Sequence, residues 1–253
     1  MIDLHTHTTA SDGTDSPFAL VNKALSTGIT VLGVTDHDTT SGWAEAISAA
    51  RKPISLALGA EISTLTEDGI SVHMLGLLFD GENSEIQAML SDARDTRIPR
   101  MKKMVELLRS DGFAISMEDV IAATPEGATL GRPHLADALV KNGVVKSRDE
   151  AFAELLTNDS KYYVTHATPT PEVAIRTIVA AGGVAVIAHP MASRRGDVIS
   201  TSIFTDLVAA GLHGIEIDHR DHSASERAEL RLIASELNLV ITGASDYHGQ
   251  GKL

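Results

Sequence analysis

Met1-Ile2-Asp3-Leu4-His5-Thr6-His7 opens the chain and runs into Thr8-Thr9-Ala10-Ser11-Asp12-Gly13. The first segment alternates in character, which predicts a short β-strand whose residues i and i+2 share a face. His5 and His7 are therefore expected to point together, and two imidazoles on one face can bind one metal ion. The second segment has the residues of a turn. It predicts Asp12 on a loop directly beyond the strand, from where its carboxylate can reach the two histidines.

Outward from this stretch, the chain alternates between predicted helices and strands. Ser16-Pro17, followed by an apolar-periodic run that ends at Gly28, predicts a helix with a serine N-cap and a glycine terminator. Strands are expected at 29–35, 54–60, 71–79, 183–188, 214–218 and 239–244, and further helices at 41–50, 170–181, 201–210 and 224–237. Strands that alternate with helices form βαβ units, so we expect an α/β fold with a mostly parallel sheet.

The middle of the sequence breaks this alternation. Helical patterns at 84–112, 117–123, 132–142 and 147–156 follow one another without a strand, and Ser116-x-x-Asp119 marks the start of one of them. We interpret residues 83–167 as a small α-helical insertion that covers the mouth of an α/β core. Residues 1–82 and 168–253 are expected to form that core.

The composition is typical of a soluble globular enzyme. Of the 253 residues, 43% are hydrophobic and 22% are charged, no apolar run reaches the length of a membrane span, and the first ten residues lack the features of a signal peptide. We therefore expect a cytoplasmic protein without a membrane partner. The formal net charge of −13 disfavours general binding to nucleic acid. The absence of cysteine leaves His, Asp and Glu as metal ligands, a set that suits Mn, Fe or Zn.

Potential ligands recur at comparable places in the alternation. Those at or just past predicted C-terminal strand ends are His5, His7, Asp12, His37, Glu61, His189, Asp246 and His248. His73 is an exception, because it lies near the start of a strand. In a parallel α/β barrel the C-terminal ends share one rim, where active sites are built. Each residue alone has an ordinary explanation, such as a turn acid or a loop histidine, but their common placement predicts a centre of two or three divalent ions.

These residues lie in motifs that resemble those of the PHP (polymerase and histidinol phosphatase) family. The motifs are His5-x-His7 with Ser11-Asp12-Gly13, Thr35-Asp36-His37-Asp38, Gly59-x-Glu61, Val72-His73-x-Leu75-Gly76, Ala188-His189-Pro190 and Ser245-Asp246-x-His248. The resemblance covers the expected core on both sides of the helical segment, and it implies a distorted, TIM-like barrel of seven β/α units. The segment with Gly131-Arg132-Pro133-His134 resembles the branch that hydrolyses nucleoside phosphates and trims RNA or short oligonucleotide 5′ ends.

The resemblance also implies how the ligands are divided. One ion would be held by His5, His7, Glu61 and Asp246, a second by Glu61, His73 and His189, and a third by Asp12, His37 and His248. Glu61 would bridge two ions, and a metal-bridging hydroxide would attack phosphorus. The catalytic residues implied are Glu61, His189 and Asp246. From their position beside His37, Asp36 and Asp38 are expected to fix the orientation of its ring.

A second group of residues is predicted to contact the substrate. Segment 94–103 is locally basic, and Arg97 and Arg100 are its candidate phosphate contacts, although a solvated helix face is the ordinary explanation of such a run. Pro133 fits the first position of a helix, which places Arg132 at the N-cap and His134 in the first turn, where backbone N–H groups favour an anion. We expect Arg132 and His134 to bind a substrate phosphate. The remaining histidines are taken as residues without a special role: His166, His213, His219 and His222.

The predicted function is metal-dependent hydrolysis of a phosphate ester of a small nucleotide. Expected substrates are a nucleoside 3′,5′-bisphosphate or a short oligonucleotide, with a nucleoside monophosphate such as AMP as product or ligand. Five Phe, three Tyr and one Trp argue against a long track for single-stranded nucleic acid. The alternatives are a 5′-3′ RNA exonuclease, a histidinol-phosphate or sugar-phosphate phosphatase, a metal-dependent amide hydrolase, and a non-catalytic metal-binding regulatory module.

Overall fold

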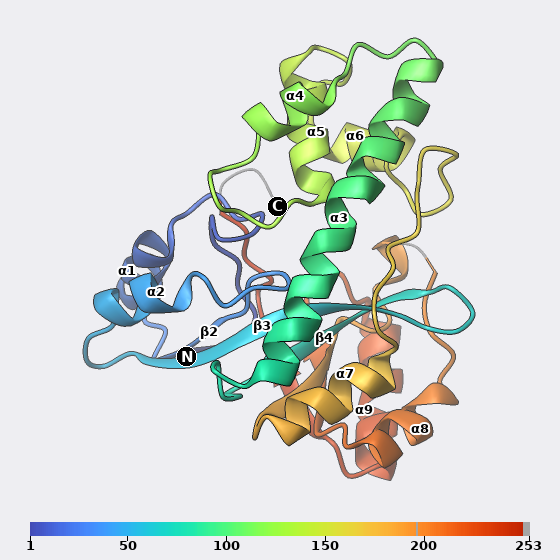
Figure 1. The fold of residues 1–253 in the computed structure, drawn as a ribbon. Coiled ribbons are helices and arrows are strands. Elements are labelled where there is room, and N and C mark those ends of the chain that lie inside the picture. The colour runs from blue at the N-terminus through green and yellow to red at the C-terminus, as the bar shows by residue number, and fades with distance from the viewer. Residues whose placement is uncertain (196, 250–253) are drawn as a thin grey trace.

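Seven strands wrap into a nearly closed barrel in the computed structural model, which describes residues 1–195 and 197–249 (Figure 1). Neighbours in the sheet follow the order of the chain. The strands are β1 (Ile2–Asp3), β2 (Val31–Val34), β3 (Ser55–Leu65), β4 (Ser71–Leu77), β5 (Val184–Ala188), β6 (Gly214–Asp218) and β7 (Val240–Gly243). The α/β barrel that the sequence predicts is therefore confirmed.

One strand, β4, runs opposite to its neighbours. The pairs β1–β2, β2–β3, β5–β6 and β6–β7 are parallel, whereas β4 is antiparallel to both β3 and β5. A tight connection between β3 and β4 causes the reversal: Gly69 adopts a φ of +87°, and the Thr66 N–H donates to the Ile70 carbonyl at 2.9 Å. Such a short connection can join only antiparallel strands, because a parallel pair needs a crossover of about a dozen residues.

The two ends of the sheet meet at residues that follow β1 and β7. Thr6 and Tyr247 form a parallel bridge, and the His7 N–H donates to the Tyr247 carbonyl at 2.8 Å. The first histidine motif and the last motif are thus side by side, although they come from opposite ends of the described chain.

The helices begin within one or two residues of the predicted starts. They are α1 (Pro17–Ser26), α2 (Trp43–Ala49), α3 (Ser84–Ser110), α4 (Met117–Ala122), α5 (Arg132–Lys141), α6 (Arg148–Glu154), α7 (Pro171–Ala180), α8 (Ile203–Ala210) and α9 (Ala224–Glu236), with a 3-10 turn η1 (Ser193–Arg195). The Ser16 side chain accepts from the Ala19 N–H, and Ser116 and Asp119 form a capping box. These contacts satisfy N–H groups that a helix start leaves unpaired.

The start of α5 differs by one position from the prediction. Gly131 is the N-cap, with φ of −142° and ψ of 169°, and its N–H donates to Nδ1 of His134 at 3.0 Å. Arg132 is therefore the first helical residue. The predicted N-cap was wrong because the His134 ring accepts from the backbone N–H of Gly131. With this contact, the helix can start at a glycine, which has no capping side chain of its own.

Two separate hydrophobic clusters are joined by α3. Ile86 and Leu90 in its first half pack into the cluster between the barrel and α7–α9. Met104 and Leu108 in its second half pack with α4, α5 and α6. All four side chains are fully buried, and Figure 1 shows α3 rising from the barrel to the layer that α4–α6 form. The division into a core and an inserted helical domain at 83–167 stays a prediction.

None of the helices in the described part of the chain combines the length and the apolar character that crossing a bilayer requires. With 27 residues, α3 is long enough, but its sequence carries acidic and basic side chains throughout. Its length instead serves to connect the two hydrophobic clusters.

Candidate metal centre

Four side chains from distant parts of the chain converge on one point inside the barrel. The Nε2 atoms of His5 and His7 lie 3.0 Å apart. Asp246 Oδ1 lies 3.4 and 3.3 Å from them, and Glu61 Oε2 lies 3.3 and 3.1 Å from them. None of the four residues is more than 1% exposed. Ligand atoms that bind one divalent ion at about 2.1 Å are themselves about 3.0–3.4 Å apart, so this spacing matches a coordination sphere.

Glu61 faces two groups of histidines with its two oxygens. While Oε2 faces His5 and His7, Oε1 lies 2.8 Å from His73 Nδ1 and 3.1 Å from His189 Nε2. A carboxylate placed in this way can contribute one oxygen to each of two neighbouring ions.

The direction of β4 explains why His73, near the start of a strand, belongs to the site. Because β4 is antiparallel, its start lies at the same rim as the C-terminal ends of its neighbours, and His73 pairs with Ser63 and Ala188. The strand that carries Glu61 also crosses this rim. It continues to Leu65, because residues 62–65 pair with β4, and the predicted strand end at residue 60 was therefore wrong.

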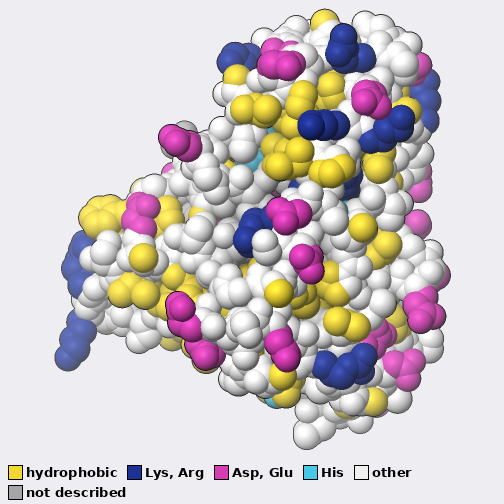
Figure 2. Space-filling view, in the orientation of Figure 1, with side chains coloured by type: hydrophobic (Ala, Val, Ile, Leu, Met, Phe, Trp, Pro, Cys, Tyr) yellow, Lys and Arg dark blue, Asp and Glu magenta, His cyan; other side chains and the backbone are white. Residues whose placement is uncertain are grey.

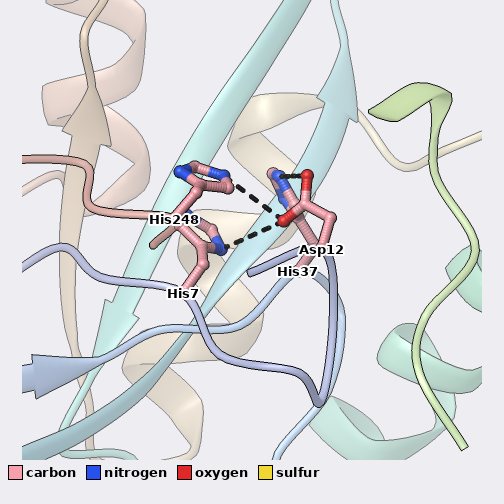
Figure 3. Close-up of side chains that lie close together, drawn as sticks. All are labelled: His7, Asp12, His37 and His248. Carbon is pink, nitrogen blue, oxygen red and sulfur yellow. Dashed lines mark ion pairs between the residues drawn. The ribbon is translucent and has the colours of Figure 1, made fainter. Parts of the chain in front are cut away.

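A third group surrounds Asp12 (Figure 3). Its Oδ1 lies 3.3 Å from His248 Nε2 and 3.8 Å from His7 Nδ1, and its Oδ2 lies 3.8 Å from His37 Nε2. One ligand atom from each of the four residues lies within 4.8 Å of the others. The structure thus brings all nine predicted ligands to one region, with His7 between the first group and the third.

Burial and nearby charges shift the pKa values of His5 and His7 in opposite directions. Burial alone would lower the pKa of His7, but Asp246 and Glu61 raise it to about 9. The pKa of His5 is likewise raised well above its usual value, with Glu61 as the main charge that outweighs burial. Positive charge is therefore favoured at this point, and a divalent ion can supply it in place of the protons.

The donor set fits a divalent metal ion. Within residues 1–195 and 197–249, the buried Nδ1 atom of His7 has no hydrogen-bond partner of suitable geometry, and His37 Nδ1 lies 3.0 Å from Glu61 Oε2 without the geometry of a hydrogen bond. The facing Nε2 atoms of His5 and His7 can form at most one hydrogen bond with each other, whereas both lone pairs can bind one ion. Nitrogen and oxygen donors without sulfur suit ions such as Mn, Fe or Zn.

Asp36 and Asp38 hold the backbone around the site. Asp36 accepts from the Thr8 N–H at 2.7 Å and from the Ser11 hydroxyl at 2.6 Å. Asp38 accepts from the Ser63 N–H at 2.8 Å. Among the described residues, the Asp36 carboxylate bonds to the loop that carries Asp12. The Asp38 carboxylate bonds to β3 and to Arg97 in α3, and neither bonds to the His37 ring as the sequence suggested.

A cavity of about 570 Å³ extends from the predicted metal ligands to the helical segment. Its wall includes Glu61, His73, His189, Arg97, Arg100 and Arg132. Pockets for small molecules usually measure about 300–1,000 Å³, so the cavity is large enough for a nucleotide. Figure 2 shows little histidine on the face that it presents, and the rings of His5, His7 and His248 are buried.

Arg97 and His134 have contacts that support the structure. Arg97 donates through Nε and NH2 to Asp38 and through NH1 to the Leu130 carbonyl. His134 is only 2% exposed, caps α5 through Gly131, and does not line the cavity. The structure therefore places Arg97 in the cavity wall and His134 behind it. Phosphate binding by either residue stays a prediction.

Arg100 and Arg132 flank the Tyr163 ring. Each guanidinium carbon lies 5.2 Å from the ring centre. Burial lowers the pKa of Arg100 to about 10, and the charge of Arg132 contributes to the shift. Burial also lowers the pKa of Arg132. The two partly buried guanidinium groups repel each other, and an anion bound beside them would relieve the repulsion.

Glu216 is buried beside the predicted ligands, and the sequence analysis did not identify it. It lies in β6 between Ile215 and Ile217, which pack into the outer hydrophobic cluster. Because side chains alternate along a strand, Glu216 must face the barrel interior, where it contacts His5. This alternation was visible in the sequence and could have identified the residue.

His219 was predicted to have no special role, but it lies next to Asp246, a predicted ligand. Its ring is fully buried, with Nε2 3.5 Å from Asp246 Oδ2. The Asp221 N–H donates to His219 Nδ1 at 3.1 Å, so the ring proton lies on the nitrogen that faces Asp246. The short turn after β6 gave no periodic signal from which this position could be predicted.

His166 is expected to make the protein sensitive to acid. Burial lowers the pKa of His166 to about 4, with help from Arg97 and Arg100, while its Nε2 donates to the Ala93 carbonyl at 3.0 Å. Between pH 6.5 and pH 4 the unfolded chain takes up a proton on this ring that the folded protein does not, so stability falls as the pH falls. The full loss from this group is at most about 3 kcal/mol.

The His166→Gln variant provides the comparison, because glutamine keeps a donor for the Ala93 carbonyl and does not titrate. We expect the free energy of unfolding of the chelator-treated wild type to fall more steeply than that of the variant between pH 7 and pH 4, as measured by urea titration. Equal slopes for the two proteins would contradict the assignment.

The amino-acid sequence of this chain is similar to those of known proteins. A family model described as PHP domain matches residues 3–156. A 3′,5′-nucleoside bisphosphate phosphatase from Chromobacterium violaceum is 34% identical over 99% of this chain and 88% of its own. A 5′-3′ exoribonuclease from Haemophilus influenzae is 34% identical over 97% of this chain and 89% of its own.

A solved structure shows the same architecture. It belongs to a protein from Bifidobacterium adolescentis that is described as a metal-dependent phosphoesterase, with 42% identity and a TM-score of 0.94. The match covers 99% of this chain and 88% of that one. Similarity at this level extends over the barrel and the helices α3–α6 alike.

Proposed function

This chain belongs to the PHP domain family, and from that premise we propose that it is a metal-dependent phosphoesterase that hydrolyses phosphate esters of small nucleotides. The observation that carries the proposal is the convergence of nine His, Asp and Glu ligands at one end of a nucleotide-sized cavity. Bound divalent ions neutralise charge on the phosphoryl oxygens, activate water and stabilise the leaving oxygen, which are the needs of this reaction.

The ligands are assigned to three positions. The first comprises His5, His7, Glu61 and Asp246; the second Glu61, His73 and His189; the third Asp12, His37 and His248. The two oxygens of Glu61, one toward each histidine group, support its role as a bridge. Two or three ions of Mn, Fe or Zn are expected, since the wider 3.8 Å separations around Asp12 suit a more weakly held ion.

Glu61, Asp246 and His189 are the proposed catalytic residues. Glu61 and Asp246 are buried, and they hold negative charge at the inner end of the cavity. The His189 side chain is 11% exposed and forms part of the cavity wall, so it can contact both the second position and the phosphate of a bound substrate.

A second phosphate of the substrate is proposed to bind at the opposite side of the cavity. Arg100 and Arg132 are its main contacts, because their partly buried guanidinium groups both lie beside the Tyr163 ring. Arg97 and His134 remain additional candidates. In this arrangement the helical segment 83–167 covers the mouth of the barrel and supplies the second phosphate site. A nucleoside 3′,5′-bisphosphate, the substrate in the name of the Chromobacterium relative, has the two phosphates that such a cavity requires.

A 5′-3′ exoribonuclease is the second candidate, favoured by the Haemophilus relative. An RNA with a 5′-phosphate also presents two phosphates one nucleoside apart. Its terminal phosphate would bind the arginines, and the first phosphodiester would reach the metal ligands. The two candidates therefore use the same residues and differ in whether the cavity admits a continuing chain.

The test is a panel of substrates on protein of measured metal content. We expect turnover of nucleoside 3′,5′-bisphosphates, with His5→Ala as the inactive control. Stepwise release of mononucleotides from a 5′-phosphorylated oligonucleotide would favour the exoribonuclease, and selective release of phosphate from histidinol phosphate would favour a phosphatase of another class. Stoichiometric metal without turnover of any phosphoester would contradict the proposal and indicate a metal-binding module.

A further inference from the structure

Glu216 is a fully buried carboxylate in β6, and both of its oxygens are in use. Its Oε1 lies 3.1 Å from Nδ1 of His5, and its Oε2 accepts from the backbone N–H of His189 at 2.9 Å. Glu216 does not line the cavity. The residue therefore lies behind the ligands, in contact with members of two different proposed metal positions.

The first contact fixes the proton on the His5 ring. An ionised carboxylate can only accept, so Nδ1 of His5 carries the proton that Glu216 accepts. The other ring nitrogen, Nε2, then presents its lone pair to the first metal position, 3.3 Å from Glu61 Oε2. A carboxylate behind a histidine ligand orients the ring and makes it a stronger donor to a metal.

The second contact holds an unusual backbone conformation. His189 has a φ of +29°, in the region that residues with a side chain rarely adopt. In this conformation the ring reaches Glu61, with Nε2 3.1 Å from Oε1. Without the carboxylate of Glu216, the His189 N–H would lose the acceptor that it has in this conformation.

We propose that Glu216 is a positioning residue that aligns His5 and His189 together and so sets the separation of the two metal positions that Glu61 bridges. The inference rests on the proposed metal centre. One carboxylate with two fixed contacts links a ring in the segment after β1 to a backbone turn after β5. A change at Glu216 therefore affects both positions at once, although Glu216 does not touch the substrate.

The test compares Glu216→Gln and Glu216→Ala with wild type. Asp218→Asn serves as the matched control, because Asp218 lies on the same strand but is half exposed and pairs with Arg231 at the surface. Glutamine keeps the volume and one acceptor oxygen, so it can satisfy only one of the two donors. The measurements are metal content at saturation, metal affinity by chelator competition, the visible spectrum of the cobalt-substituted protein, kcat and KM, and the melting temperature in chelator.

For Glu216→Gln we expect unchanged metal content at saturation, about 10–100-fold weaker metal affinity and an altered cobalt spectrum. The value of kcat should fall by a similar factor with KM nearly unchanged, and Glu216→Ala should be affected more strongly. Asp218→Asn should match wild type in all measurements.

Two outcomes would overturn the inference. Loss of one equivalent of metal at saturation in the glutamine variant would mean that Glu216 is itself a ligand, as its position in a group with His5 and His189 also allows. Wild-type affinity and spectrum in the glutamine variant would mean that it only fills space. Metal affinity and the cobalt spectrum are measured without turnover. A wild type that hydrolyses no phosphoester would therefore contradict the proposed function, while these two measurements would still test the role of Glu216.

Discussion

Glu61→Gln is expected to reduce phosphoester hydrolysis at least about a thousandfold, equivalent to about 4 kcal/mol of transition-state stabilisation. The side chain is 1% exposed, and its two oxygens face two histidine groups. An amide keeps the shape but cannot bridge two cations, because its nitrogen offers no lone pair to a metal. Metal content should fall by at least one equivalent, as measured by elemental analysis after gel filtration.

The matched control is Glu67→Gln, in the exposed turn that follows the same strand. This variant should keep both metal and activity. Folding of the Glu61 variant is checked by its circular dichroism and its melting temperature in chelator. If a folded Glu61→Gln protein retained its metal and hydrolysed substrate at the wild-type rate, the bridging role would be wrong.

Arg132→Ala is expected to lower kcat/KM by about 10–1,000-fold, equivalent to about 1.4–4 kcal/mol, with unchanged metal content. The guanidinium lies at the first turn of α5, next to the Tyr163 ring, and donates to the Leu156 carbonyl and to Asn158. These contacts hold it at the cavity wall, so its charge is available to a phosphate without a change of conformation.

Arg132→Lys should fall between wild type and alanine, since lysine keeps the charge and loses the planar fork. Arg109→Ala, at the exposed end of α3, serves as the control and should be unaffected. The loss should be largest for a substrate with two phosphates and small for one with a single phosphate. Unchanged kinetics on every phosphoester in the panel would remove Arg132 from the substrate site.

Local signals predicted most of the fold. Caps such as Ser16 and Ser116 are read from neighbouring residues, and the alternation of helices and strands follows from periodicity within each element. The antiparallel direction of β4 was not predicted, because the hydrophobic periodicity of a strand is the same in either direction. Asp68-Gly69, between two apolar runs, was the available hairpin signal, and it would have placed His73 at the common rim.

The contacts of individual side chains were harder to predict than the positions of the proposed ligands. Arg97 pairs with Asp38, 59 positions earlier in the chain, and only the packing of α3 on the barrel brings them together. His134 faces the backbone of Gly131 for a similar reason, since its direction depends on how α5 starts. Motif spacing indicates which residues reach the rim of the barrel. Which other side chains or backbone groups bind those residues depends on the three-dimensional packing.

The junction of Thr6 with Tyr247 has a consequence for protein synthesis. A ribosome releases His5 and His7 early, and Asp246 and His248 only after nearly all the described residues have been made. No chain that stops before residue 246 can therefore assemble the full first ligand set. Once the last motif arrives, an ion bound there would join the two ends of the barrel, and its binding energy would count directly toward folding. Retention of an ion at the first position would thus distinguish a chain that includes residue 246 from one that stopped before it.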